Sequence, residues 1–256
     1  MKTKELFELQ SALVTCLTDP AALSEFKSGA AAWKKLSFVD PGLMDFLSSL
    51  YVGKRIDKLT RIFPLTLEYL APEMDELIPE FVKRHPPINA DSYTAGCQFY
   101  HFLRRRWLTQ SPDPPFLPDL AYCELARVGV EKAPQAGGPA VLTDGYPVGA
   151  AIAIRRRRGV RLHVCEYNVQ PLFAPEGYQG EPIAHEVMCV VLSRPLASYA
   201  GKIYFMDQAL FGLLRNLNSW TRISLADDTL NNRQTSAMLQ RLEALGCLEV
   251  QLCESE

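Results

Sequence analysis

The first half of the chain repeats apolar residues at the spacing of an α-helix. Leucines recur every three or four residues from position 6 to position 17, and Asp19-Pro20 then ends the segment. Asp40-Pro41 is typical of a helix start, with aspartate as the N-cap and proline at the first helical position. Similar patterns predict helices over residues 20–35, 54–63, 64–70, 74–84, 92–108 and 118–128. Residues 1–130 are therefore expected to form a helical domain.

The period changes to that of β-strands after residues 131–139, a stretch that favours neither helix nor strand. Residues 151–154 and 160–164 alternate across an arginine-rich turn, which predicts a β-hairpin. Further strands are expected at 185–192, 202–206 and 247–252, helices at 207–217 and 232–245, and a short helix or turn at 221–226. Gly246 is placed to cap the last helix.

These patterns predict an α+β fold of two domains. Residues 140–256 are expected to form a β-sheet domain after the helical one. Within it, residues 199–252 give strand, helix, short helix, longer helix and strand, the order of elements in a winged helix-turn-helix. The sequence therefore predicts a winged-helix-like element at the end of the chain.

Composition indicates a globular protein without membrane spans. Of the 256 residues, 48% are hydrophobic and 22% are charged, and the net charge is −2. This charge gives no global attraction to nucleic acid or to anionic lipid. The chain has no signal-like N-terminus and no apolar run of about 20 residues. Its seven cysteines are scattered and lack CxxC spacing, as expected for reduced thiols in a cytoplasmic protein.

No pattern of a catalytic or cofactor site is present in the sequence. P-loop, GxGxxG, HExxH and GxSxG motifs are absent. The four histidines are too dispersed to suggest a metal cluster. We therefore expect no catalytic residue, no metal ligand and no cofactor in this chain.

Two arginine runs stand out. Arg104, Arg105 and Arg106 lie in a predicted helix, where they spread around the axis and are expected to face solvent. The second run is expected at the hairpin end, where four guanidinium groups repel one another unless an anion approaches; it consists of Arg155, Arg156, Arg157 and Arg158. Contact with an acidic peptide or an acidic partner surface is one interpretation of this run, and solvent exposure or nucleic-acid binding are the others.

A winged helix serves either DNA or peptide recognition. In the last predicted helix Arg233 and Arg241 are the only cations, Glu243 offsets them, and Asp227-Asp228 precedes the helix. This charge pattern counts against a DNA-binding transcriptional regulator, which remains the alternative hypothesis. The β-prone segment 201–206 suggests instead an edge strand to which an extended peptide adds, although an ordinary strand explains the pattern equally well.

Two segments resemble known families. Residues 51–126 resemble the helical N-terminal domain of proteins encoded beside multinuclear non-haem iron oxidases. The matching features are Tyr51 with Arg55, the turn RIFP at 61–64, Phe81 with His85-Pro86-Pro87, Ser92-Tyr93, Gly96, Phe99, Phe102-Leu103 and the run 116–126. That run lacks the arginine and tryptophan of the usual ending. Residues 199–250 resemble the small peptide-recognition domain of systems that modify ribosomal peptides, through GKIYFM at 201–206 and LEALGCL at 242–248.

Together the two segments are similar to the partner subunits of methanobactin and 3-thiaglutamate biosynthesis. The resemblance implies a heterodimer in which this chain binds the leader of a precursor peptide. The other subunit, an iron oxidase, contains the iron and modifies a cysteine of that peptide. The helical domain would dock on the oxidase. The residues expected to contact the leader are Lys202, Ile203, Tyr204, Phe205, Met206, Met238, Arg241, Leu242 and Leu245. Residues 1–50 have no counterpart in the family.

Overall fold

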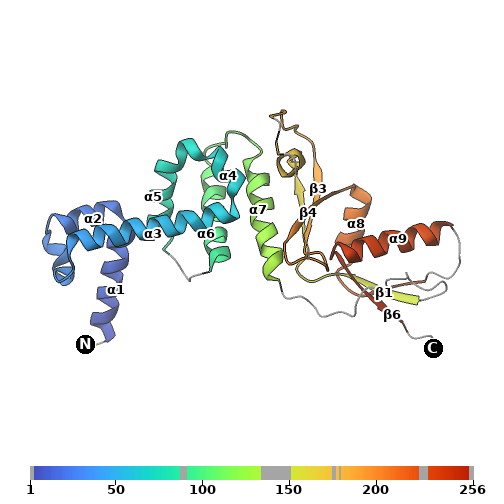
Figure 1. The fold of residues 1–256 in the computed structure, drawn as a ribbon, viewed down its shortest axis with the longest axis horizontal. Coiled ribbons are helices and arrows are strands. Elements are labelled where there is room, and N and C mark those ends of the chain that lie inside the picture. The colour runs from blue at the N-terminus through green and yellow to red at the C-terminus, as the bar shows by residue number, and fades with distance from the viewer. Residues whose placement is uncertain are drawn as a thin grey trace. The chain divides into compact units, whose positions relative to one another are not determined.

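The chain folds as two compact units, residues Met1–Leu117 and Pro118–Glu256 (Figure 1). The computed structural model describes residues 3–86, 91–133, 151–174, 177–178, 180–224 and 230–253. In these residues a helical N-terminal region is followed by two small antiparallel sheets, so the predicted α+β class is confirmed. None of the described helices is long and apolar enough to cross a membrane.

The first unit is built from helices. They are α1 (Thr3–Thr18), α2 (Pro20–Lys27), η1 (Ala31–Leu36), α3 (Pro41–Ile62), α4 (Pro64–Tyr69), η2 (Ala71–Glu73), α5 (Met74–Arg84) and α6 (Ser92–Trp107). The predicted cap of α3 is confirmed, because the Asp40 carboxylate accepts a hydrogen bond from Leu43 N at 2.8 Å. The two helices predicted from Pro41 and over 54–63 are one continuous helix, since the single Gly53 between them is tolerated in a helix interior.

An aromatic core holds a buried cation in this unit. The Arg55 guanidinium lies 4.4 Å from the centre of the Phe81 ring and donates hydrogen bonds to the Tyr51 hydroxyl and the His85 carbonyl. Phe81 also packs edge-on against Phe99, with 5.0 Å between the ring centres. Tyr51, Arg55, Phe81, His85 and Phe99, which carry part of the resemblance, therefore meet in this core, where they stabilise the helical packing.

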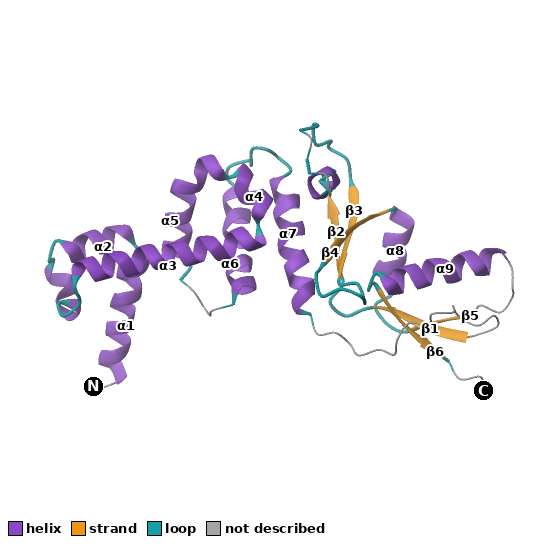
Figure 2. Ribbon diagram, in the orientation of Figure 1, coloured by secondary structure: helices purple, strands orange, loops and turns teal. Residues whose placement is uncertain are grey.

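The second unit begins with α7 and contains every described strand. Its elements are α7 (Leu117–Lys132), β1 (Ala151–Arg156), β2 (Arg161–Cys165), η3 (Gln170–Phe173), β3 (Met188–Ser193), β4 (Lys202–Met206), α8 (Gln208–Asn216), β5 (Thr221–Ser224), α9 (Leu230–Ala244) and β6 (Leu248–Leu252). The strands form two antiparallel sheets in the orders β5-β1-β6 and β2-β3-β4 (Figure 2).

Helix α7 groups with the second unit, although the sequence places it at the end of the helical domain. The Glu131 carboxylate accepts a hydrogen bond from Gly201 N at 2.9 Å. Gly201 lies so close to the helix that a Cβ atom there would be 2.2 Å from the Arg127 carbonyl oxygen. Only glycine permits this approach, which ties α7 to the start of β4.

The predicted β-hairpin between residues 151–154 and 160–164 is wrong. Strand β1 pairs with β5 and β6, whereas β2 pairs with β3. Two main-chain hydrogen bonds, Arg156 N to Leu217 O at 2.7 Å and Arg157 N to Cys247 O at 2.9 Å, hold the end of β1 away from β2. Gly159, with φ +94°, then redirects the chain into the other sheet.

The short helix or turn predicted at 221–226 is also incorrect over its described part. Residues 221–224 form β5, in which Thr221 and Ile223 lie opposite Ile154 and Ile152 of β1. Because β-branched side chains pack well on a sheet, the pairing overrides the local helical tendency. Residues 225 and 226 lie outside the described residues.

One apolar core lies between the sheets and helices α8 and α9. It includes Ile152, Val191, Phe211, Leu214, Leu239 and Leu242, all buried. Gly246 ends α9 with φ +72°, and the amide of Cys247 donates to Leu242 O at 2.8 Å, so the predicted glycine cap is confirmed. The same core fixes where α9 lies relative to β4.

Candidate functional site

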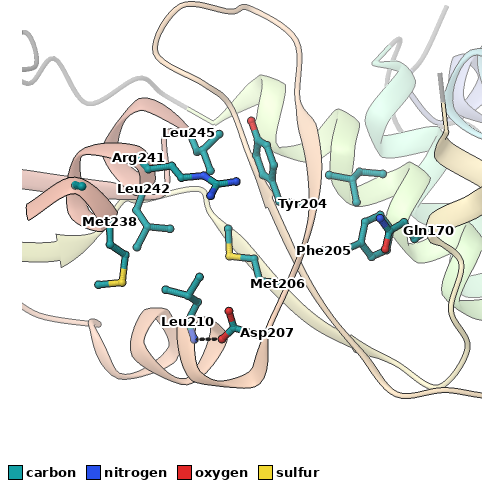
Figure 3. Close-up of a pocket in the computed structure, with 12 residues that line it drawn as sticks. Gln170, Tyr204, Phe205, Met206, Asp207, Leu210, Met238, Arg241, Leu242 and Leu245 are labelled. Carbon is teal, nitrogen blue, oxygen red and sulfur yellow. Dashed lines mark hydrogen bonds between the residues drawn. The ribbon is translucent and has the colours of Figure 1, made fainter. Parts of the chain in front are cut away.

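Strand β4 is the outer strand of its sheet as far as the structure is described, and a cavity of about 610 Å³ lies beside it. We call this cavity the β4–α9 groove (Figure 3). Its lining residues are Gln170, Ile203, Tyr204, Phe205, Met206, Asp207, Leu210, Ala237, Met238, Arg241, Leu242 and Leu245. The volume lies in the usual range for ligand pockets, which is about 300–1,000 Å³.

Local sequence explains how the groove forms. The strand ends at Asp207, whose side chain accepts a hydrogen bond from Leu210 N at 2.8 Å and so starts α8. Helix α9 carries Met238, Arg241 and Leu245 at spacings of three and four residues, which puts them on one face. That face and the start of α8 form the walls of the groove opposite β4.

Side chains of β4 alternate between the two faces of the sheet. Tyr204 and Met206 point toward α8 and α9, and Phe205 points the other way, beside Gln170 (Figure 3). Burial raises the pKa of Tyr204 to about 12, so its phenol stays protonated well above neutral pH. Most of the residues that line the groove are apolar, and its charged groups are the exposed guanidinium of Arg241 and the exposed carboxylate of Asp207.

A second hollow of about 460 Å³ lies on the other face of β4. We call it the η3 hollow, and it is lined by Asn168, Gln170, Pro171, Phe173, Ala174, Ile203 and Phe205. Gln170, Ile203 and Phe205 belong to both cavities. The outer strand is thus bordered by open space on both faces, which suits an extended chain whose side chains alternate.

The structure gathers most of the residues that the resemblance assigned to leader binding. All of them line the groove except Lys202, which is exposed at the start of β4. Gln170, Asp207, Leu210 and Ala237 also line it and were not predicted. Ala237 lies four residues before Arg241, so the helical period of α9 puts it on the same face. Gln170 lies far earlier in the chain, and no local pattern connects it to β4.

The arginine run lies at the end of β1 and is partly engaged inside the chain. Arg155 Nε donates to the Glu249 carboxylate at 2.6 Å, and its guanidinium lies 4.5 Å from the Trp220 ring centre. Arg156 donates to the Asn218 side chain at 2.6 Å. Arg157 is half-buried and Arg158 is exposed. The run therefore does not present four equivalent guanidinium groups to a partner.

A polar cluster with metal-binding donor atoms lies between α7 and β2, apart from the groove. Donor atoms of Asp119, His163 and Cys165 lie within 4.8 Å of one another. Burial lowers the pKa of His163, but hydrogen bonds to Asp119 and Cys165 outweigh it and raise this pKa to about 9. A hydrogen bond from Cys123 lowers the pKa of Cys165 to about 7. No pattern in the sequence predicted this cluster.

Comparisons of the chain with protein-family models and with curated proteins give no match.

Proposed function

We propose that this chain is a non-catalytic partner subunit that binds the leader of a ribosomally made precursor peptide and presents the peptide's cysteine to an iron-dependent oxidase. The observation that carries the proposal is the pair of cavities on the two faces of the outer strand β4. The resemblance of residues 51–126 and 199–250 to known partner proteins adds the expectation that the partner is an iron oxidase and that the modified residue is a cysteine.

An extended leader would join the sheet as the next strand beside β4. Unpaired main-chain groups of an outer strand provide hydrogen bonds that do not depend on peptide sequence. Alternate leader side chains would then enter the β4–α9 groove and the η3 hollow, which supplies specificity. Met206, Met238 and Leu242 suit apolar side chains, and Arg241 suits an acidic one.

In this proposal β4, α8, α9 and β6 act together as a winged-helix-like peptide-recognition element. The helical unit docks on the oxidase, and both proteins work in the cytoplasm, where the precursor is made. The iron of the oxidase supplies the redox chemistry. This chain contributes proximity, because tethering the leader raises the local concentration of the cysteine to about the millimolar range.

The direct test measures leader binding by fluorescence anisotropy, using as the probe a short cysteine-containing precursor peptide sought among the genes that neighbour the one for this chain. Ala237 is exposed and lines the groove, so Ala237→Arg fills the groove without altering the core. We expect at least about 30-fold weaker binding, or ~2 kcal/mol. Ala244→Arg is the matched control, since Ala244 is exposed on the same helix outside the groove, and its affinity should stay within about twofold of wild type.

A second measurement separates the proposal from the DNA-binding alternative. The chain is co-expressed with the oxidase and precursor, and iron is quantified in each purified fraction. A stable complex with iron confined to the oxidase, and peptide modification only when both proteins are present, supports the proposal. Unchanged binding by Ala237→Arg, or a chain that purifies alone and retains duplex DNA, overturns it.

A further inference from the structure

Helix α7 and strand β2 bring four donor side chains together, which we call the Asp119 cluster. Asp119 and Cys123 are four residues apart on α7 and therefore share one face of the helix. His163 and Cys165 are two residues apart on β2 and share one face of the sheet. Within the described residues, these two faces meet at a carboxylate, an imidazole and two thiols.

Two of the separations between donor atoms are close to those around a small tetrahedral ion. Asp119 Oδ1 lies 3.4 Å from His163 Nε2, and the Sγ atoms of Cys123 and Cys165 are 3.9 Å apart. Zinc bonds of about 2.0–2.3 Å in tetrahedral geometry place neighbouring ligand atoms roughly 3.3–3.8 Å apart. The donor atoms of Asp119, His163 and Cys165 lie within 4.8 Å of one another, and Cys123 joins this group of three through its contact with Cys165. For all four donors to bind one ion, the Cys123 side chain must move toward Asp119 and His163.

Neighbouring groups fix the orientation of two of these donors. Asp119 Oδ2 accepts hydrogen bonds from the amides of Glu166 and Tyr167 at 2.8 and 3.1 Å, which leaves Oδ1 directed at His163. The His163 ring stacks on Tyr122, with 3.9 Å between the ring centres. Supporting contacts of this kind are typical of metal ligands, whose geometry depends on a second layer of hydrogen bonds and packing.

Two other uses of the cluster fit less well. Cys123 and Cys165 are both fully buried, with 0% exposure, so neither thiol can reach an external substrate as a nucleophile. A disulfide requires a sulfur–sulfur distance of about 2.05 Å and an oxidant, and it leaves Asp119 and His163 without a role. A closed metal site uses all four side chains.

We infer that Asp119, Cys123, His163 and Cys165 form a structural zinc site that fastens α7 to β2. Four protein ligands and buried sulfur donors are characteristic of structural rather than catalytic zinc. On binding, the two thiols and any imidazolium release their protons to solvent, and the ion accepts two sulfurs, one nitrogen and one oxygen. The inference does not depend on leader binding by β4.

The test is metal titration of the reduced, chelator-treated full chain, with Zn²⁺ followed by mass spectrometry and Co²⁺ as the optical probe. We expect one ion per chain, a tetrahedral Co²⁺ spectrum and a thiolate-to-cobalt charge-transfer band. Cys165→Ser and His163→Ala should each weaken binding by at least about 100-fold. Cys97→Ser, which alters a cysteine in α6, is the matched control and should bind like wild type.

Circular dichroism of the metal-free variants checks that each one folds, and Asp119→Asn provides a milder change should His163→Ala not fold. Cys123→Ser should lose about half of the charge-transfer intensity, since it removes one of two thiolates. A wild-type chain that binds less than one ion at micromolar concentration overturns the site. So does a Cys165→Ser variant that keeps the full charge-transfer band.

Discussion

The two faces of the sheet β2-β3-β4 differ in chemistry, although they share the same three strands. On one face Val191, Tyr204 and Met206 pack toward α8 and α9 in an apolar core. On the other face His163 and Cys165 meet the polar side chains of α7. The first face offers area and shape to a ligand, whereas the second offers a few donor atoms in fixed positions.

The positions of the two sites on the sheet differ as well. The β4–α9 groove borders β4, and the Asp119 cluster lies at β2, on the opposite side of β3. With about 4.8 Å between neighbouring strands, the two sites are roughly 10 Å apart across the sheet. The comparison shows that β2 contacts α7 through the Asp119 cluster, whereas β4 is tied to α7 at its start and is bordered by the groove farther along.

The largest expected effect comes from a substitution in the Asp119 cluster, where α7 contacts β2. Asp119→Ala removes the carboxylate that accepts hydrogen bonds from the Glu166 and Tyr167 amides. We expect the free energy of unfolding of the metal-free protein to fall by about 3 kcal/mol, because each hydrogen bond to a charged group contributes roughly 1.5–3 kcal/mol. Urea unfolding followed by circular dichroism measures the change.

Leader affinity of the folded Asp119→Ala protein should stay within about twofold of wild type, since the substitution lies two strands from the groove. A loss of affinity as large as the loss of stability would show instead that the two faces act as one unit.

The next effect concerns the apolar face. Met238 is half-buried and lines the groove without belonging to the fully buried core. Met238→Ala should weaken leader binding about tenfold, the loss expected when a flexible apolar contact of ~1.4 kcal/mol disappears. Isothermal titration calorimetry gives the affinity, and the unfolding free energy should change by less than about 1 kcal/mol. Tight binding by Met238→Ala would place the leader elsewhere.

A smaller effect tests the charge at the groove. Arg241→Glu reverses an exposed cation that lines it, and Arg215→Glu makes the same change on α8 outside the groove. We expect about fivefold weaker leader binding at low salt for Arg241→Glu, and a smaller difference at high salt, because exposed charges are screened. Arg215→Glu should leave the affinity unchanged. Tighter binding by Arg241→Glu would mean that the leader is basic at this position.

Local patterns predicted most of the described strands, but they missed β5 and did not predict how the strands pair. Strand β4 and helix α5 lie at the predicted bounds, 202–206 and 74–84, because short-range periodicity and flanking Asp or Pro determine both ends. The expected hairpin failed for a different reason. Adjacent strands usually pair, but distant segments, β5 and β6, compete for the same edges of β1.

The two candidate sites differ in the same way. Met238, Arg241 and Leu245 could be placed on one face because their spacing is helical and the resemblance named the strand opposite. Asp119 and His163 are separated by 44 positions, and no period relates a helix face to a strand face across that distance. Only the tertiary fold brings these side chains together.

The substitution with the smallest expected effect tests whether the leader contacts both faces of β4. Phe173 is half-buried in the η3 hollow and does not line the β4–α9 groove. Because side chains of an added strand alternate, every second one should meet this hollow. Phe173→Ala should therefore weaken binding about threefold, or ~0.7 kcal/mol, the modest loss expected at the rim of an interface.

Titrating full-length leader and a leader shortened at each end measures the change. An effect that disappears with one shortened peptide would locate the contacting residue, whereas equal affinities for wild type and Phe173→Ala with every peptide would restrict recognition to the α9 side of the strand.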